Sequence, residues 1–410
     1  MISPGYETKL PIIKVLDMEY VLLSKQGYSP SSVQLYYPQK FSDLKQVLQL
    51  FEDAPLAFDF ETTGLSAIKN DIVSIGLSNG RNTVAIQLPV HMRISICNWL
   101  NNQQLIAFNY IFDGAFMAKY TGQVIAPYAD AMVMFKTLSN EGYVGQSWGL
   151  KAAMTNILGW DNKNSDDVKE YMKVHKCAMH SVPFDILGVY NGLDALATYQ
   201  LWEYLNSFTE MFPALPSFWA TEWSTLSALL IEQYHAGIYV DVKYYTDYQN
   251  ELKEQADKLY VKFITLCGEH ITEYNNRAHA AAFPPYPENR KTNKDLSMSV
   301  NYKKYLVKEE AARYMMYFNI GSSQQIAWLF YDRLKFDIKK TTEGGAPCVD
   351  KTVLHLFGDY GKVLRDYRKV VKEIGTVQQI LDDQVKGRVH PAVKIHATIT
   401  GRCASGEDKK

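Results

Sequence analysis

Short apolar runs separated by polar turns fill the first third of the chain. Each run contains several Val, Ile, Leu, Ala or Phe residues and ends at Gly, Pro, Asn, Asp or Ser. Runs of this length and composition predict β-strands. We expect strands at 55–60, 71–78, 82–88 and 105–108. The Gly-Arg-Asn sequence at 80–82 predicts the turn between two of them.

Helical spacing becomes frequent further along the chain. Apolar residues recur every three or four positions at 41–53, where Ser42 is a suitable N-cap, and again near 111–119. The same spacing continues through "GLKAAMTNILG" (149–159) and "VPFDILGVYNGLDALATYQLWEYL" (182–205). Three successive strands followed by alternating strands and helices predict an α/β domain with a mixed sheet.

Prolines and polar stretches divide the chain into parts. The segment "FTEMFPALPSFWATE" (208–222) predicts a boundary, and the sequence beyond it is mostly of helical pattern. Prolines at 281–293 predict a loop within this second region. We therefore expect an irregular N-terminal extension over 1–40, an α/β domain over 41–208 and a mainly helical domain over 209–410.

Composition and charge place the chain among soluble globular proteins. Of its 410 residues, 47% are hydrophobic and 21% are charged, and the net charge is −1. The charge is uneven, because residues 331–410 hold 16 Lys and Arg against 11 Asp and Glu, whereas residues 1–200 hold 15 against 18. A basic C-terminal portion favours contact with a phosphate backbone.

Cysteine usage and the N-terminus indicate a cytoplasmic protein. The five cysteines are odd in number and form no Cys-x-x-Cys pair, which argues against a disulfide framework or a zinc site. The N-terminal residues lack a cleavable signal pattern, and no stretch approaches 18 consecutive apolar residues. We expect no association with a membrane.

Two acids one residue apart, Asp59 and Glu61, interrupt the first strand. Residues i and i+2 of a strand point to the same face, so the two carboxylates lie together. Such close negative charges repel each other unless a cation joins them, and hard ions such as Mg²⁺ or Mn²⁺ prefer oxygen ligands. Two exposed acids on a solvated edge strand would give the same pattern.

Two further acids have a polar partner four residues earlier. Asp113 follows Asn109 directly after the run at 105–108, and a helix there would put both on one face. Asp194 follows Tyr190 inside an otherwise apolar helical stretch, where a carboxylate needs a partner. Taken singly, each could be a helix cap or a surface acid.

The order of these motifs resembles the tyrosine-bearing branch of the DEDD superfamily of 3′–5′ exonucleases. "DFETTGL" (59–65) is close to the first motif of that family, and "YADAMVM" (128–134) with "GLKAAM" (149–154) resembles its middle segment. The resemblance implies a ribonuclease H-like α/β fold, with a mixed five-stranded sheet and helices, over 41–208.

The resemblance also implies a chemistry for these residues. The carboxylates of Asp59, Glu61, Asp113 and Asp194 would hold two divalent ions, Mg²⁺ or Mn²⁺, that stabilise an in-line displacement at phosphorus. The Tyr190 hydroxyl would orient the attacking water. Residues Thr62, Leu65 and Asn109 would bind the last nucleotides of a single-stranded 3′ end. The product would be a nucleoside 5′-monophosphate.

The second half of the chain resembles family A DNA polymerases of the DNA polymerase I type. The match runs through "LLIEQYHAGIYVD" (229–241), "FNIGSSQQIAWLFYDRLKF" (318–336), "KKTTEGGAPCVDKTVLHLF" (339–357) and "GRVHPAVKIHATITGRCAS" (387–405). It implies a mainly α-helical thumb and the start of a palm over 209–410, gripping a primer–template duplex. The residues implied in backbone contact are Ser322, Ser323, Gln324, Lys339, Lys340, Thr341 and Arg402.

Three departures from the family pattern qualify this assignment. Residues 272–316 are longer than the usual connection, which predicts an insertion. Cys403 stands where the family more often has an aliphatic residue. The Asp-Tyr-Ser and His-Asp-Glu strings of the palm do not occur in the 410 residues. We therefore expect no polymerase active site in this chain, a separate chain as a possible source of palm and fingers, and a phage-like origin.

Three functions are compatible with these patterns. The first is the proofreading exonuclease portion of a family A DNA polymerase, acting in DNA replication. The second is a stand-alone DEDD exonuclease that processes RNA, against which the thumb-like segments argue. The third is a non-catalytic DNA-binding or clamp subunit of a split polymerase, against which the presence of all four acids and the tyrosine argues.

Overall fold

The computed structural model describes residues 33–52, 54–139, 149–160, 163–293, 298–312, 317–395, 398 and 402–405. The chain forms two compact units. The first unit combines residues up to 238 with residues 388–410, and the second unit spans 239–387. The chain thus leaves the first unit at 238 and re-enters it at 388.

A six-stranded mixed sheet forms the centre of the first unit. Its strands, in the order in which they lie side by side, are β1 (Val33–Tyr36), β4 (Thr83–Gln87), β3 (Ile72–Ser78), β2 (Leu56–Thr62), β5 (Leu105–Ala107) and β6 (Ala129–Asp130). Strands β2, β3 and β4 pair antiparallel, whereas β1 is parallel to β4, and β5 is parallel to both β2 and β6. The predicted mixed α/β sheet is confirmed.

Two details of the first unit, one in the sheet and one at a helix start, differ from the sequence-based expectation. The sheet has six strands rather than five, because β1 lies within the segment expected to be irregular and pairs with β4 through all four of its residues. The N-cap predicted at Ser42 is wrong. The first helical turn begins at Phe41, and the carboxylate of Asp43 accepts the backbone N–H groups of Gln39 and Lys40 instead. Residues 1–32 of the predicted extension lie outside the described residues.

The first unit contains helical segments on both faces of the sheet. In chain order they are η2 (Phe41–Leu44), α2 (Lys45–Gln49), η3 (Val90–Met92), α3 (Arg93–Leu100), α4 (Tyr110–Thr121), α5 (Ala131–Ser139), α6 (Leu150–Asn156), α7 (Lys163–His175), η5 (Met179–Ser181), α8 (Phe184–Ser207), η6 (Phe208–Glu210), α9 (Leu215–Phe218), the π-helical turn η7 (Trp219–Trp223) and α10 (Ser224–Ala236).

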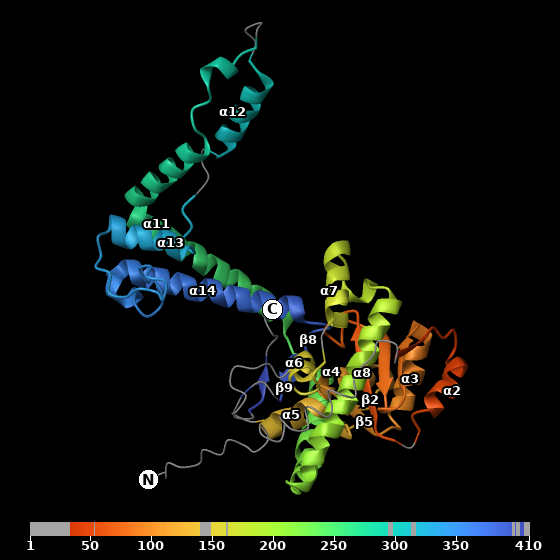
Figure 1. Ribbon diagram of the computed structural model, residues 1–410. Helices are drawn as coiled ribbons and strands as arrows, with labels where there is room; N and C mark the ends of the chain where they lie inside the picture. Colours follow the sequence, from red (N-terminus) through yellow and green to blue (C-terminus); the bar gives the residue numbers. More distant parts are fainter. Residues whose placement is uncertain are drawn as a thin grey trace, which may run out of the picture. The chain divides into compact units, whose positions relative to one another are not determined.

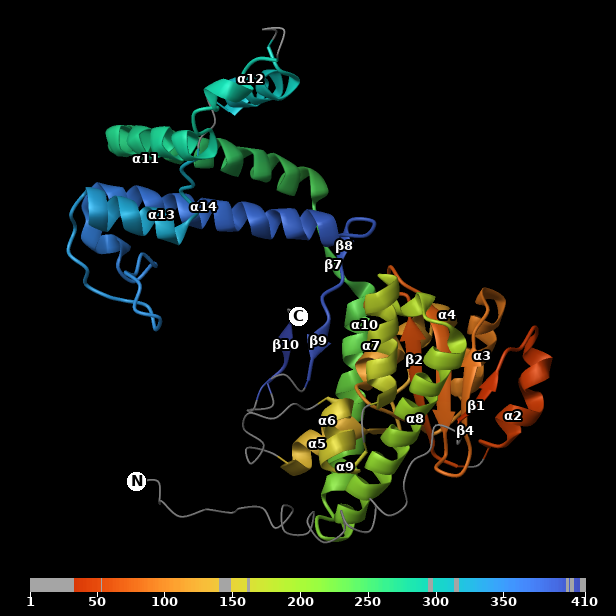
Figure 2. The same cartoon turned by 45° about the horizontal axis from the view of Figure 1, so that its top comes forward.

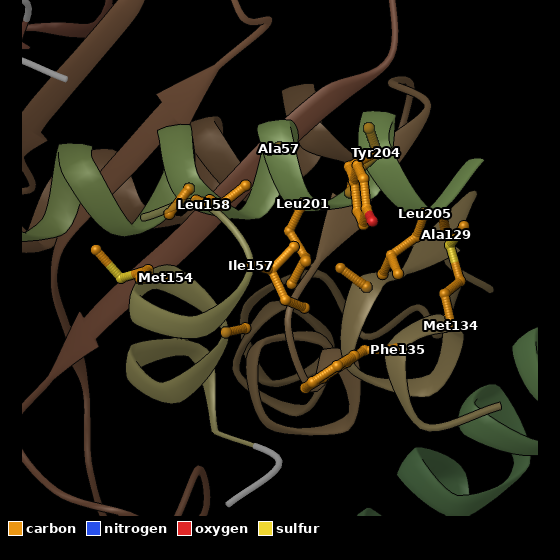
Figure 3. Close-up of a cluster of buried hydrophobic side chains, with 14 of the residues drawn as sticks. Ala57, Ala129, Met134, Phe135, Met154, Ile157, Leu158, Leu201, Tyr204 and Leu205 are labelled. Atoms are coloured by element: carbon orange, nitrogen blue, oxygen red, sulfur yellow. The ribbon is translucent and has the colours of Figure 1, made fainter. Parts of the chain in front are cut away.

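Helix α8 crosses one face of the sheet and contacts strands β1 to β5 (Figure 1). Helices α5 and α6 pack beside it, and the shared core includes Met134, Phe135, Ile157, Leu201 and Leu205 (Figure 3). These side chains fill the space between the three helices and the sheet. Burial of this apolar surface fixes α8, and therefore its polar residues, relative to the strands.

Helices α2, α3 and α4 cover the opposite face (Figure 2), where Phe58 and Phe60 of β2 are buried among apolar side chains. Because side chains alternate along a strand, the neighbouring Asp59 and Glu61 point to the face that α8 covers. The pattern of the strand therefore delivers both acids to the same side as Tyr190 and Asp194.

Two glycines permit α8 to approach the sheet closely. A Cβ atom at Gly76 of β3 would lie 2.3 Å from the backbone carbonyl oxygen of Asn191, and one at Gly192 would lie 2.4 Å from a methyl group of Val33. Separations this short are not tolerated. Any side chain at either position would push α8 away from the sheet.

The second unit is built on two long helices, α11 (Val242–Ala282) and α14 (Gly358–Asp383), which pack along each other. Leu252 and Ala256 of α11 meet Val370 and Val377 of α14 at one end. A larger apolar core around Phe263 and Phe330 lies further along, and three short elements contribute to it: α13 (Ser323–Ala327), η9 (Trp328–Arg333) and η10 (Leu354–Phe357). The unit also contains η8 (Glu288–Arg290) and α12 (Val300–Ala312). The predicted mainly helical second region is confirmed.

The predicted insertion, 272–316, comprises the end of α11, η8 and α12, apart from 294–297 and 313–316, which lie outside the described residues. Tyr286, Tyr302 and Tyr305 pack together with ring centroids 5.1–6.2 Å apart. The Tyr305 hydroxyl donates to the carbonyl oxygen of Pro284 at 2.9 Å. An aromatic cluster of its own thus holds α12 against the loop.

The two compact units meet at 238/239 and 387/388 in the sequence, whereas the predicted boundary lies near 208. Helix α10 belongs to the first unit because Ile231 is buried in the same core as Phe116 of α4. Ile395, which is 1% exposed, also belongs to the first unit's core. Short strand pairs accompany the return of the chain, β7 (Ile238–Tyr239) with β8 (Arg388–Val389) and β9 (Val393–Lys394) with β10 (Ala404–Ser405). No helix among the described residues has the length and apolar character needed to cross a membrane.

Candidate active site

Strand β2 places Asp59 and Glu61 beneath α8. They face Gly76 and Ser74 of β3 in the antiparallel register, and the pairing shifts between Glu61 and Thr62. Glu61 is buried, with 8% of its surface exposed, and Asp59 is partly buried. The two acids lie on the face predicted from their spacing.

Asp113 reaches the same strand from the first turn of α4. Strand β2 pairs with β5 only at Leu56 and Ala57, so the N–H of Phe60 has no ladder partner on that side. The Asp113 carboxylate accepts this N–H at 3.1 Å and is itself 2% exposed. The divergence of the two strands thereby leaves a donor that fixes Asp113 next to β2.

Asn109 does not share a helical face with Asp113, contrary to the expectation. Helix α4 begins at Tyr110, and Asn109 precedes it with φ of 71°, in the left-handed region. The buried carboxylate of Asp130 explains this conformation, because it accepts the N–H of Asn109 at 3.0 Å and that of Tyr110 at 2.8 Å. Asp130 also accepts the N–H of Met132, so one carboxylate joins the starts of α4 and α5.

Helix α8 supplies Tyr190, Asn191 and Asp194. Asp194 is 6% exposed, and the Tyr190 hydroxyl donates to its carboxylate. Asn191 is fully buried and donates to Asp59 from the intervening position. The helical spacing of four residues puts the tyrosine and the aspartate on one side, as their sequence spacing predicts.

A cation also lies in this cluster. Lys151, in the first turn of α6, forms an ion pair with Oδ1 of Asp194, and its Nζ is 4.1 Å from the centre of the Tyr190 ring. Its charge also lowers the pKa values of Asp59 and Glu61. The charge of Lys151 therefore lowers the pKa values of three of the four acids, Asp59, Glu61 and Asp194.

The electrostatics show that the four acids form one group. Burial, together with the charge of Asp194, raises the pKa of Asp59 to about 8. Burial and the charges of the other three acids hold the pKa of Glu61 well above its usual range, and burial with the charge of Asp59 does the same for Asp113. Burial also raises the pKa of Asp194. The four carboxyl groups therefore lie close together at a place from which water is largely excluded.

Burial and the charges of three of these acids, Asp194, Glu61 and Asp59, raise the pKa of the Tyr190 hydroxyl as well. The hydroxyl therefore stays protonated at neutral pH and serves as a hydrogen-bond donor or as a neutral contact for a water molecule. It cannot act as a phenolate base in this environment.

The donor chemistry fits a hard divalent cation. Buried carboxylates that raise one another's pKa values are stabilised when a cation joins them, and all their donor atoms are oxygens. Within the described part of the chain, no three acidic, His or Cys side chains converge as they stand on a single ion position.

Two of the residues predicted to bind terminal nucleotides, Thr62 and Leu65, lie at the end of β2 and in the turn after it, and the third, Asn109, precedes α4. The Thr62 hydroxyl donates to the carbonyl oxygen of Gly64 at 2.8 Å and shapes the turn that follows the strand. Leu65 in this turn is 77% exposed, an unusual position for a leucine. Asn109, at the start of α4, is partly exposed.

The residues predicted to contact a duplex fall into three groups. Ser322 caps α13 by accepting the N–H of Gln325 at 3.4 Å, and Ser323 and Gln324 follow in its first turn. Lys339 and Lys340 already pair with Asp337 and Asp350, at 3.0 and 3.3 Å, and Thr341 is exposed beside them. Arg402 is exposed but belongs to the first unit, so the structure does not group it with the others.

Sequence reasoning did not assign roles to Lys151, Asn191 or Asp130. The sequence around each of them could have indicated a role. Lys151 lies in "GLKAAM" and Asp130 lies in "YADAMVM". Asn191 is a polar residue directly after Tyr190 within an apolar helix. The signal is a polar residue in an apolar context, which requires a buried partner.

Comparison with known proteins agrees with this geometry. Residues 37–210 match the family described as 3′-5′ exonuclease, and residues 290–408 match DNA polymerase family A. A DNA polymerase of Bacillus phage SP01 is 25% identical over 240 residues, which cover 55% of this chain and 25% of that protein. The chain thus spans about a quarter of the length of this relative.

A solved structure is similar in fold. It is the POL domain of Pol1 from M. smegmatis in complex with DNA primer-template and dNTP. The match has a TM-score of 0.59 and 14% sequence identity, and it covers 90% of this chain and 54% of that chain. At this level of identity the similarity concerns the fold alone.

Proposed function

Because the chain belongs to DNA polymerase family A and carries a 3′-5′ exonuclease domain, we propose that its first unit removes nucleotides one at a time from the 3′ end of DNA. The observation that supports this most directly is the cluster of Asp59, Glu61, Asp113 and Asp194 with Tyr190 beside them. Proteins of these families generally use divalent metal ions. We propose two such ions, Mg²⁺ or Mn²⁺, as the cofactors.

Each acid would have a distinct place in ion binding. Asp59, held at the centre of the cluster, would contribute to both ions. Glu61 and Asp194 would hold one ion and Asp113 would support the other. When bound, the ions would lower the pKa of a water nucleophile and offset charge on the phosphoryl and leaving oxygens.

The remaining residues position the reacting groups. The protonated Tyr190 hydroxyl would orient the attacking water by a hydrogen bond. Leu65, in the exposed turn after β2, and Thr62, at the end of the strand, would contact the terminal bases and sugar. The burial that raises the pKa values of the acids also strengthens their interactions with cations, because water screens them little.

The second unit would bind the duplex part of a primer–template. The match to DNA polymerase family A over 290–408 favours DNA over RNA as the substrate, and with it a role in proofreading during replication in a bacterial or phage-infected cytoplasm. Hydroxyl groups at the start of α13 and the lysines near 340 would contact phosphates without reading sequence. We place nucleotide incorporation outside these 410 residues, on palm and fingers carried by the same or a separate chain, because neither palm string occurs here.

The test uses a 5′-labelled single-stranded DNA, a matching RNA and added Mg²⁺. Wild-type protein should shorten the DNA from its 3′ end and should stop when EDTA is added. Asp59→Ala should lower this rate by several orders of magnitude, because it removes a metal ligand. Asp166→Asn, a change at an exposed acid of α7, is the matched control and should retain the rate.

Cleavage that survives EDTA, or an Asp59→Ala rate equal to that of wild type, would reject the metal-dependent exonuclease. Faster degradation of the RNA than of the DNA would favour an RNA-processing enzyme instead.

A further inference from the structure

Asn191 connects three elements of the first unit at the centre of the acid cluster. It lies on α8 and none of its surface is exposed. Its Nδ2 atom donates to the backbone oxygen of Asp59 at 3.0 Å and to Oδ2 of the same residue at 2.8 Å. Its Oδ1 atom accepts the hydroxyl of Ser74 on β3 at 2.9 Å. The side chain thus bridges α8, β2 and β3.

The hydrogen-bond partners allow only one orientation of this amide. The backbone oxygen of Asp59 is an acceptor at every pH, so the NH₂ group must face it. The Ser74 hydroxyl can then donate to the amide oxygen. A flipped amide would set its oxygen against the backbone oxygen of Asp59, where two acceptors would repel.

The backbone of Asn191 lies close against strand β3. Gly76, which pairs with Asp59 across the strands, lies so close to α8 that a Cβ atom there would be 2.3 Å from the Asn191 carbonyl oxygen. Helix, strand and side chain are therefore held together at one point. The amide connects this point of contact to one carboxylate oxygen of Asp59.

We propose that Asn191 is a positioning residue, which holds the Asp59 carboxylate in the orientation that binds the catalytic metal ions. The inference rests on the proposed exonuclease function and assigns one more residue to that site. A carboxylate offers about four lone-pair positions, so one donated hydrogen bond leaves the others for metal ions. Residues that orient metal ligands typically change metal affinity or activity by 10- to 100-fold when they are removed.

The test compares Asn191→Ala with wild type and with Thr198→Val. Thr198 lies on the same helix, is 1% exposed, and has a hydroxyl without a hydrogen-bond partner among the described residues. Its change therefore controls for altered packing on α8. Mn²⁺ binding is measured by electron paramagnetic resonance of the free ion, and exonuclease turnover is measured against Mn²⁺ concentration.

We expect Asn191→Ala to weaken Mn²⁺ binding by about 10- to 100-fold and to shift the activity curve to higher Mn²⁺ by a similar factor. At saturating Mn²⁺ part of the lost turnover should return, because the ions themselves then hold Asp59. Thr198→Val should bind Mn²⁺ as wild type does. Equal Mn²⁺ affinity in Asn191→Ala and Thr198→Val would overturn the proposal.

A second variant covers the case in which Asn191→Ala does not fold. Ser74→Ala removes the donor that fixes the amide oxygen but leaves Asn191 and Asp59 in place, so it should shift Mn²⁺ binding in the same direction by a smaller factor. An unchanged affinity in folded Ser74→Ala would then count against the proposal.

The two hypotheses fail in different ways. Wild-type protein that neither binds Mn²⁺ nor degrades DNA would reject the proposed function, and with it the role of Asn191. Wild-type protein that does both, with Asn191→Ala indistinguishable from Thr198→Val, would reject the role of Asn191 alone.

Discussion

Lys151 of α6 donates a hydrogen bond to the carboxylate of Asp194 on α8, 43 residues later in the chain. The lysine ammonium thereby adds a positive charge to a group of buried acids in the metal-free protein. It also lies over the ring of Tyr190, one turn before Asp194 on α8. A side-chain cation and a metal ion would thus bind to the same carboxylate.

Replacement of Lys151 should change the melting temperature of the metal-free protein and that of the metal-bound protein by different amounts. In EDTA at pH 8, Lys151→Met should lower the melting temperature by several degrees, because the acids lose their counter-charge. Added Mn²⁺ should raise the melting temperature of Lys151→Met by more than it raises that of wild type. Differential scanning calorimetry measures both values, with Lys169→Met, an exposed lysine of α7, as the control. Equal shifts in the two lysine variants would show that Lys151 does not compete with metal.

The stability of the metal-free protein should fall as pH rises. The pKa of Asp59 is about 8 in the folded state, because of burial and the charge of Asp194, and near 3.9 in an unfolded chain. A raised pKa contributes stability that is complete below about pH 4 and is lost as pH rises through about 8. Melting temperature in EDTA should therefore decrease between pH 5 and pH 9.

The Asp59→Asn variant is the control for this pH dependence, since it keeps the shape of the side chain and removes its titration. Its melting temperature should exceed that of wild type at pH 8 to 9 and should fall less steeply. Parallel curves for the two proteins would assign the pH dependence to other groups.

Removal of the Tyr190 hydroxyl should affect turnover rather than substrate binding. Tyr190→Phe keeps the ring and its packing but removes the donor that we assign to the attacking water. We expect kcat to fall by about 10- to 1000-fold, the scale of one positioning or proton-handling group, with little change in KM. Steady-state kinetics on single-stranded DNA measures the two parameters. Tyr199→Phe on the same helix should behave as wild type, and an unchanged kcat in Tyr190→Phe would limit Tyr190 to packing.

The lysines near 340 should carry part of the affinity for duplex DNA. Lys339 and Lys340 pair with Asp337 and Asp350 in the free protein, and phosphates would replace these exposed acids. The double change to Ala should weaken duplex binding and flatten its dependence on salt by roughly one to two units in the log–log slope. Fluorescence anisotropy over 50 to 200 mM salt measures this slope. Lys243→Ala, at an exposed lysine of α11, is the control, and equal slopes in the two variants would exclude a role for the pair.

The alternation of one strand was enough to predict that Asp59 and Glu61 point to the same face of the sheet. The period of two along β2, with Phe58 and Phe60 between the acids, admits only one arrangement once a core forms on the aromatic side. The four-residue spacing of Tyr190 and Asp194 was equally informative, because α8 is regular throughout. Local periodicity carries this information without any knowledge of tertiary contacts.

The conformation of Asn109 and the positions of Lys151 and Asn191 could not be predicted in the same way. Each depends on a partner far away in the chain: Asp130 for Asn109, Asp194 for Lys151, and both Asp59 and Ser74 for Asn191. Spacing within one helix or strand contains no information on such pairs. The strand β1 was missed for a similar reason, since its pairing with β4, which lies 50 residues later in the chain, defines it rather than its own short sequence.

Ile395 completes the core of the first unit although the entire second unit precedes it in the sequence. During translation, the ribosome must therefore synthesise residues 239–387 before this side chain exists. At roughly 5–20 residues per second, the delay is on the order of 10 s. Throughout that interval the nascent first unit exposes the apolar surface that Ile395 later covers. Chaperones or proteases would therefore bind the first unit while this surface is exposed.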